Sequence, residues 1–126
     1  MRKRILVIDD EELLVKTFAR LLERIRYEVS VASRPDDAIT MAQKENFDLV
    51  LCDMRMPGKN GVETIREMRT VQKSQGKPEV PVIFLTGFAD PKLEREAQIL
   101  NPVAYLYKPF DTSKLLEVID SALEEE

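Results

Sequence analysis

Carboxylate, hydroxyl and amine side chains each follow a short apolar run in this chain. In order they are Asp9, Asp10, Asp53, Thr86 and Lys108. Carboxylates that lie close together repel one another, which raises their pKa values unless a cation joins them. Mg²⁺ suits such a group because it takes one or two carboxylates, keeps waters and accepts phosphate oxygens. A carboxylate can attack phosphorus, and an ammonium and a hydroxyl can stabilise the transferred group, so these residue types favour phosphoryl transfer.

Each of these residues also has an ordinary structural explanation. Asp53 stands before Pro57 and Gly58, and Asp is common in turns. Asp9 and Asp10 precede an amphipathic stretch, where acids are favoured by the helix dipole. The chemical interpretation therefore depends on whether the fold brings the five residues together.

Short apolar runs bounded by turn residues predict five strands, each followed by an amphipathic helix. The predicted strands are 5–8, 29–32, 49–53, 80–85 and 103–107, and the predicted helices are 13–25, 35–42, 62–69, 91–100 and 111–123. Ser33, Asp90 and Asp111 are predicted to cap helices, and Pro91 suits a first helical position. The polar stretch 72–79 contains Gly and Pro and predicts an exposed loop.

Strands without polar alternation are typical of a parallel sheet that is covered on both faces. The predicted fold is α/β, a flavodoxin-like doubly wound (βα)5 domain over residues 1–126, with a five-stranded parallel sheet in the order 2-1-3-4-5. The carboxyl ends of parallel strands meet at one edge, and the switch point of this order lies between strands 1 and 3. We therefore expect all five polar residues to converge there.

The composition narrows the possible functions. The chain of 126 residues has a formal net charge of −4, no histidine, and Cys52 as its single cysteine. These features exclude histidine acid–base chemistry, histidine metal ligands and an internal disulfide, and they argue against direct nucleic-acid binding. No apolar run approaches the roughly 20 residues that span a bilayer, so we expect a cytoplasmic protein without membrane contact.

Four motifs in this order resemble the receiver domain of two-component response regulators, and the chain is similar over its whole length to the single-domain, chemotaxis-regulator-like members. The motifs are Val7-Ile8-Asp9-Asp10-Glu11, Asp53-Met54-Arg55-Met56-Pro57 with Gly61, Leu85-Thr86-Gly87, and Tyr105-Leu106-Tyr107-Lys108-Pro109-Phe110. The resemblance implies that Asp53 is the phosphoacceptor. It also implies a Mg²⁺ site formed by Asp9, Asp10, Asp53 and the backbone carbonyl of Arg55.

The resemblance implies roles for three further residues. Lys108 would pair with Asp53 and then with the phosphoryl group, and the Lys108–Pro109 bond would be cis. Thr86 would be the switch hydroxyl that moves onto the phosphoryl group. Tyr105 would be the aromatic side chain that turns inward behind it and alters the surface of helix 4, strand 5 and helix 5.

The resemblance also implies partners, and the phosphodonor histidine would come from one of them because this chain has none. The phosphoryl group would come from a sensor histidine kinase or a histidine phosphotransfer protein, and the output would be a downstream effector protein or a missing output domain. A phosphorylation-linked homodimer is a further implied possibility. The chain would not be an enzyme with a separate substrate, because its chemistry would be its own phosphorylation and dephosphorylation.

Three alternatives compete with this interpretation. A Mg²⁺-dependent aspartyl phosphatase would need a second acid two residues after the nucleophile, where this chain has Arg55. A flavodoxin-like cofactor site would need a phosphate cradle in place of Asp9-Asp10-Glu11-Glu12. A degenerate receiver that serves only as a protein-binding scaffold stays open, although the five site residues argue against it. Three features depart from the family pattern, namely the long loop 72–79, Asn101-Pro102 before the fifth strand, and Arg55 two residues after Asp53.

Overall fold

The computed structural model describes residues 2–124, so both ends of the predicted domain, Met1 and Glu125–Glu126, lie outside the described residues. Strands and helices alternate along the whole described chain. They are β1 (Arg4–Ile8), α1 (Glu12–Arg24), β2 (Glu28–Ala32), α2 (Pro35–Lys44), β3 (Leu49–Asp53), α3 (Gly61–Ser74), β4 (Val82–Thr86), α4 (Pro91–Ile99), β5 (Ala104–Tyr107) and α5 (Thr112–Leu123).

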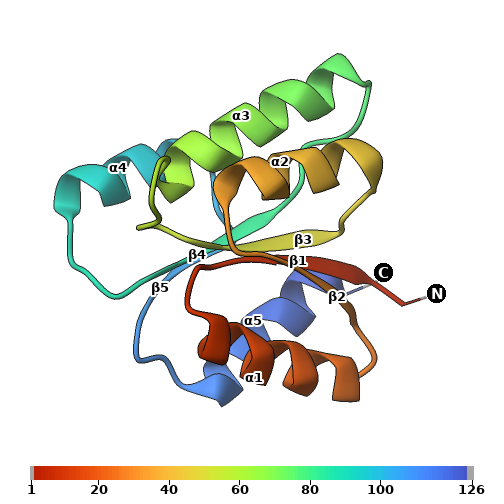
Figure 1. Cartoon of the computed structure of the whole chain (residues 1–126). Helices are drawn as coiled ribbons and strands as arrows, with labels where there is room; N and C mark the ends of the chain where they lie inside the picture. Colours follow the sequence, from red (N-terminus) through yellow and green to blue (C-terminus); the bar gives the residue numbers. More distant parts are fainter. Residues whose placement is uncertain (1, 125–126) are drawn as a thin grey trace.

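The five strands form one parallel sheet in the order β2-β1-β3-β4-β5, which confirms the predicted fold and strand order. Helices α2, α3 and α4 lie on one face of this sheet, and α1 and α5 lie on the other (Figure 1). The order of the strands reverses between β1 and β3, so the ends of these two strands frame the switch point.

The central strands are apolar on both sides because both faces of the sheet are covered. Leu6, Val50 and Phe84 belong to the core under α2, α3 and α4, while their neighbours Ile5 and Leu51 belong to the core under α1 and α5. All five residues of β3 are buried. Asp53 therefore ends a strand whose position is fixed by apolar packing on both faces.

Two of the three predicted helix caps are confirmed. The side chain of Asp90 accepts a hydrogen bond from the backbone N–H of Leu93, and that of Asp111 accepts one from Ser113. The prediction for Ser33 was wrong, because the residue that precedes α2 is Arg34 and no side chain caps that end. Pro35 occupies the first turn of α2, where its missing N–H costs no helical hydrogen bond.

The predicted loop 72–79 begins too early, because α3 continues to Ser74. The polar residues at the end of this helix are solvent-facing helical positions, apart from the buried Gln72. Beyond the helix, Gly76 has a φ of +73°, a backbone conformation that glycine adopts without strain. Lys77 then turns back and donates hydrogen bonds to the carbonyls of Ala42 and Gln43, which ties the loop to the end of α2.

Strands β4 and β5 each start later than predicted, at Val82 and Ala104. The predicted strand residues Val80, Pro81 and Val103 lie in the connections before these strands, and the order of helices and strands is unaffected. Among residues 2–124, no helix is long and apolar enough to cross a bilayer.

Candidate functional site

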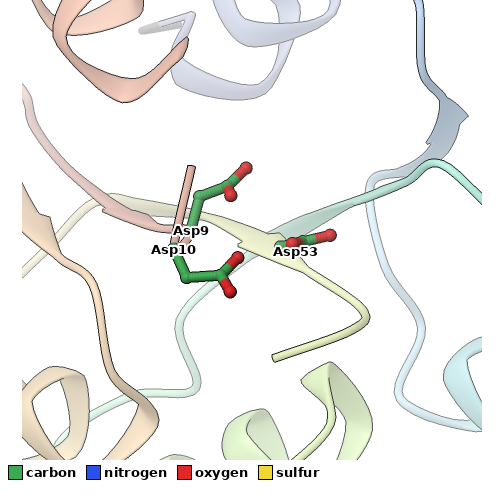
Figure 2. Close-up of side chains that lie close together, drawn as sticks. All are labelled: Asp9, Asp10 and Asp53. Atoms are coloured by element: carbon green, nitrogen blue, oxygen red, sulfur yellow. The ribbon is translucent and has the colours of Figure 1, made fainter. Parts of the chain in front are cut away.

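The strand register brings three carboxylates to the switch point. Ile8 pairs with Cys52 across β1 and β3, so Asp9 and Asp10 follow β1 directly beside Asp53 at the end of β3. One carboxylate oxygen from each of Asp9, Asp10 and Asp53 lies within 4.8 Å of the others. Figure 2 shows the three side chains leaving the two neighbouring strand ends. Asp9 and Asp53 are buried whereas Asp10 is exposed, so the cluster opens to solvent on one side.

This donor set suits a hard divalent cation. Carboxylate oxygens are the ligands that Mg²⁺ and Ca²⁺ prefer, and both ions commonly keep waters on a solvent side. The absence of histidine and of a second cysteine from the chain leaves oxygen as the ligand type available here. The structure therefore offers Asp9, Asp10 and Asp53 as ligands, whereas the Arg55 carbonyl stays a prediction from the family resemblance.

Lys108 brings a positive charge into the acidic cluster. Its Nζ donates a hydrogen bond of 2.9 Å to Asp9 Oδ2 and one of 3.2 Å to Glu11 Oε1, and it lies 3.7 Å from Asp53 Oδ1. The backbone N–H of Lys108 is bonded to the Thr86 carbonyl at 2.7 Å, which fixes its place beside β4. The peptide bond between Lys108 and Pro109 is cis, as expected.

The electrostatic environment disfavours the ionised form of Asp53. Burial, and next the charge of Asp9, raise the pKa of Asp53 to about 6. Lys108 and backbone hydrogen bonds from Arg55 and Met54 act in the opposite direction and are outweighed. A cation at this position would remove the repulsion, so the cluster as it stands favours taking up positive charge.

Lys108 is held in its charged form. Burial acts to lower the pKa of its ammonium group, but the hydrogen bond to Asp9 and the charges of Asp53 and Asp9 outweigh burial and raise it. The side chain therefore stays cationic at any physiological pH and can neutralise charge that develops next to Asp53.

Gly61 fixes the distance between α3 and the end of β3. Its N–H donates to the Met54 carbonyl at 3.0 Å. A Cβ at this position would lie 2.7 Å from the Asp53 carbonyl oxygen and 2.9 Å from the Met54 sulfur. Asn60 and Glu63 form a reciprocal capping box that starts α3 at this point. Only glycine lets the helix begin so close to the residue that follows the strand.

Arg55 lies two residues beyond β3 and reaches across to the loop after β4. Its guanidinium carbon is 4.4 Å from the centroid of the Phe88 ring, and its Nη2 is 3.8 Å from Asp90 Oδ2. Phe88 itself is 57% exposed. The pair joins the two loops that border the acidic cluster and forms its rim on that side.

Thr86 and Tyr105 lie on adjacent strands behind this rim. The Thr86 hydroxyl is paired with the backbone of Phe88, at 3.2 Å to both its N–H and its carbonyl. The Tyr105 ring packs against Phe84 at a centroid distance of 6.2 Å and against the edge of Tyr107 at 5.6 Å. Thr86 is buried and Tyr105 is half-buried, so each is held by packing in its present position.

Sequence reasoning missed two contributors to this site. Glu11 bonds to Lys108, although the sequence offered it only as part of an acidic run. Phe88 receives the Arg55 side chain, although its sequence neighbours gave it no role. The spacing contained one usable signal, because Arg55 and Phe88 each stand two residues after the end of adjacent strands.

Comparison with known proteins supports the assignment of the family. The response regulator receiver domain model matches residues 5–120. The transcriptional regulatory protein ZraR of Salmonella typhimurium is 33% identical over 119 residues, which cover 94% of this chain and 26% of that protein. The sensory/regulatory protein RpfC of Xanthomonas campestris is 31% identical over 116 residues, which cover 92% of this chain and 16% of that protein. The chain thus spans about a quarter of the length of the first relative and about a sixth of that of the second.

Solved structures agree with the sequence comparison. A CheY-like receiver domain protein from Methanospirillum hungatei has a TM-score of 0.89 and 27% identity, covering 98% of this chain and 95% of that one. A response regulator from Burkholderia pseudomallei, solved with a phosphorylated aspartic acid, a calcium ion and citrate, has a TM-score of 0.80 and 30% identity, covering 92% of this chain and 65% of that one. With the matching family model, the strand order and the acidic cluster, these likenesses show that the chain belongs to the response regulator receiver domain family.

Proposed function

We propose that this chain is a phosphorylation-controlled signalling receiver whose phosphoacceptor is Asp53. The observation that carries the proposal is the convergence of Asp9, Asp10 and Asp53 at one strand edge, with the Lys108 ammonium in contact with this cluster. The family implies that the donor is a phosphohistidine on a sensor histidine kinase or a histidine phosphotransfer protein, and this chain has no histidine of its own to supply it.

In the transfer step an Oδ atom of Asp53 attacks phosphorus and forms an acyl phosphate. The P–N bond of the donor's phosphohistidine breaks, and the electron pair stays on the donor imidazole, which takes up a proton. Asp9, Asp10, Asp53 and the Arg55 carbonyl would hold Mg²⁺, which would neutralise negative charge on the phosphoryl oxygens. Lys108 supplies a second positive charge, and burial of the strand end limits the access of water.

The raised pKa of Asp53 has a consequence for this step. A carboxylate must be ionised to attack phosphorus, and burial, with the repulsion from Asp9, opposes the ionisation of Asp53. Cationic ligands at the cluster favour the ionised form, so the same charges that bind the phosphoryl group also prepare the nucleophile. This coupling makes the reaction dependent on a divalent cation.

The response to phosphorylation is a population shift between two surface states. In the unphosphorylated chain the Thr86 hydroxyl is bonded to Phe88. A phosphoryl group on Asp53 offers strong acceptor oxygens, and the state in which Thr86 donates to them gains stability. Tyr105 then repacks behind Thr86 and changes the surface of α4, β5 and α5, where an effector protein or a second copy of the chain binds.

The test is chemical trapping of the acyl phosphate. The protein is incubated with acetyl phosphate and Mg²⁺, reduced with borohydride, digested and analysed by peptide mass spectrometry. Reduction converts an acyl phosphate on Asp53 to homoserine, so the proposal expects homoserine at position 53. Modification at another aspartate, with position 53 unchanged, would contradict the proposal.

A further inference from the structure

A second charged cavity lies at the edge of the sheet opposite Asp53. It has a volume of about 280 Å³ and is bordered by the end of α3, the loop that follows it, and Leu100. Val80 precedes β4 and Leu100 precedes β5, so the cavity stands where these strands begin. The phosphorylation site lies where the parallel strands end, and the two sites therefore occupy opposite edges.

The lining of this cavity is strongly cationic. Four basic side chains border it against the one carboxylate of Glu79; they are Arg66, Arg69, Lys73 and Lys77. This concentration is unusual in a chain whose formal net charge is −4. Closely spaced like charges around a concave surface raise the local potential and attract anions.

The side chain of Arg69 is mostly buried. It is 11% exposed, and its Nη1 and Nη2 donate to the carbonyls of Leu100 and Val80 at 2.6 and 3.0 Å. Carbonyl oxygens are dipoles and do not neutralise a full charge. The nearest carboxylate is that of Glu79, 3.7 Å away and 68% exposed. Burial outweighs that carboxylate and lowers the pKa of Arg69.

The hydrogen-bonding capacity of Arg69 is not used up. A guanidinium carries five N–H hydrogens, and the two carbonyls take one from each Nη atom. The buried Nε has no hydrogen-bond partner among the described residues. The head group therefore retains N–H hydrogens beyond the two that the carbonyls take, and the exposed Glu79 is the carboxylate paired with its charge.

The other basic side chains around the cavity have few ion-pair partners among the described residues. Arg66, Arg69 and Lys73 follow at helical spacing and lie on the same side of α3. Arg66 and Lys73 are exposed, and neither forms an ion pair with the part of the chain that the structure describes. Lys77 approaches from the loop beyond Gly76 and is held by the end of α2. The group is thus partly fixed in place before any ligand arrives.

We propose that this cavity binds a small anion that carries a phosphate group. Arginine and lysine together are suited to phosphate oxygens, which accept several hydrogen bonds at once. A single carboxylate, Glu79, is already present and leaves most of the charge uncompensated, which favours a multiply charged ligand over a simple carboxylate. The volume is near the lower end for small-molecule pockets and suits inorganic phosphate or the phosphate of a monoester.

A ligand in the cavity would affect the structure at the end of α4. Arg69 holds the Leu100 carbonyl, which belongs to the residue after α4, and the chain continues from there into β5. A ligand that draws the guanidinium toward itself changes this hydrogen bond. The cavity therefore has a direct mechanical connection to the segment between α4 and β5.

The test is a titration of the ¹⁵N-labelled protein with inorganic phosphate, and separately with AMP, followed by amide chemical shifts at constant ionic strength. We expect saturable shifts at residues 66–80 and 100–103. Saturation by phosphate assigns the site to the free ion, and saturation by AMP alone assigns it to a phosphate monoester. Shifts that do not saturate with either probe would overturn the proposal.

Variants that remove charges of opposite sign test the same site, because they should change the affinity for phosphate in opposite directions. The double variant Arg66→Ala/Lys73→Ala removes two exposed cations and should weaken binding by about tenfold, whereas Glu79→Gln removes the competing carboxylate and should tighten it about threefold. Lys16→Ala, which removes an exposed cation from α1 on the other face of the sheet, is the matched control and should leave the affinity unchanged. Equal affinity of all the variants would show nonspecific screening and would also overturn the proposal.

Discussion

The Thr86 hydroxyl is bonded to the backbone of Phe88, with a distance of 3.2 Å to both the N–H and the carbonyl oxygen. This contact stabilises the β4–α4 loop in the unphosphorylated chain. A hydroxyl has one hydrogen to donate, so Thr86 cannot keep its bond to the Phe88 carbonyl and also donate to a phosphoryl group. The exchange of one acceptor for the other is the physical basis of the proposed switch.

The variant Thr86→Ala should therefore separate phosphorylation from the response. We expect Asp53 to be phosphorylated to nearly the same extent, because the hydrogen bonds of the Thr86 hydroxyl go to Phe88 and not to the acidic cluster or Lys108. Amide shifts upon phosphorylation should stay close to residue 53 and should not reach Tyr105. A wild-type pattern of shifts across β5 in this variant would rule out the switch role of Thr86.

The variant Lys108→Ala should bind Mg²⁺ more tightly and fail to transmit the phosphorylation signal. Removal of the ammonium leaves three interacting carboxylates, Asp9, Glu11 and Asp53, without their counter-charge, so a divalent cation is attracted about fivefold more strongly. Isothermal calorimetry measures the Mg²⁺ affinity. Lys44→Ala, an exposed lysine at the end of α2, is the control and should behave as wild type.

Weaker Mg²⁺ binding by Lys108→Ala would contradict the proposed electrostatic role of this lysine. The transmission of the signal is checked by amide shifts in the phosphorylated variant. A wild-type change at β5 would show that Lys108 is not required for the response.

Gly61 should tolerate no side chain, because a Cβ there meets the Asp53 carbonyl oxygen at 2.7 Å. The variant Gly61→Ala should lower the free energy of unfolding by about 2 kcal/mol and slow the phosphorylation of Asp53, since the end of β3 must move. Gly87→Ala is the matched control, because a Cβ at Gly87 has no atom within 4 Å. Urea denaturation measures both variants, and equal stabilities would show that the close approach of α3 is not a constraint.

The variant Asp53→Asn should stabilise the protein at neutral pH when no divalent cation is added. The folded-state pKa of Asp53 is about 6, against an ordinary value of 3.8, so folding opposes its ionisation. The contribution of the neutral Asp53 carboxyl to the free energy of unfolding is therefore fully present below pH 3.8. It is lost as the pH rises through about 6. The amide has no charge to lose, so the free energy of unfolding should exceed that of wild type by roughly 1–2 kcal/mol at pH 7 and by much less at pH 4.

Urea denaturation of Asp53→Asn and wild type at the two pH values measures this difference. Mg²⁺ should reduce the advantage of the variant, because the ion favours the ionised carboxylate in the wild-type protein. An advantage that is independent of pH would show that the ionisation of the buried Asp53 carboxyl is not its cause.

The fold could be predicted from the sequence because the patterns that mark its strands and helices are local and agree with one another. Runs such as Leu49–Cys52 have no polar alternation, and Asp90 with Pro91 is a strong helix start, so the number, type and order of the elements were confirmed. The end of α3 was misjudged, because Gln72–Ser74 are polar yet helical, and tertiary contacts through Gln75 and Lys77 determine where the loop begins. Polarity alone does not separate a solvent-facing helical turn from a loop.

The convergence of the carboxylates was also accessible, because parallel topology dictates which strand ends are neighbours. The hydrogen-bond partners of individual side chains could not be predicted from the sequence. The bonds from Lys108 to Glu11 and from Arg69 to Leu100 join residues far apart in the chain, and their geometry depends on rotamers that no sequence pattern encodes. The cluster of basic side chains around Arg69 could not be predicted for the same reason.

The central claim is that Asp53 accepts a phosphoryl group in a cation-dependent reaction. The most direct measurement is intact mass after incubation with acetyl phosphate, with and without Mg²⁺, for wild type and Asp53→Asn. The account predicts the gain of one phosphoryl group only in the wild-type protein and only with Mg²⁺. No gain under any condition, or an equal gain by Asp53→Asn, would contradict it and would favour a receiver that acts as a binding scaffold or one that is modified elsewhere.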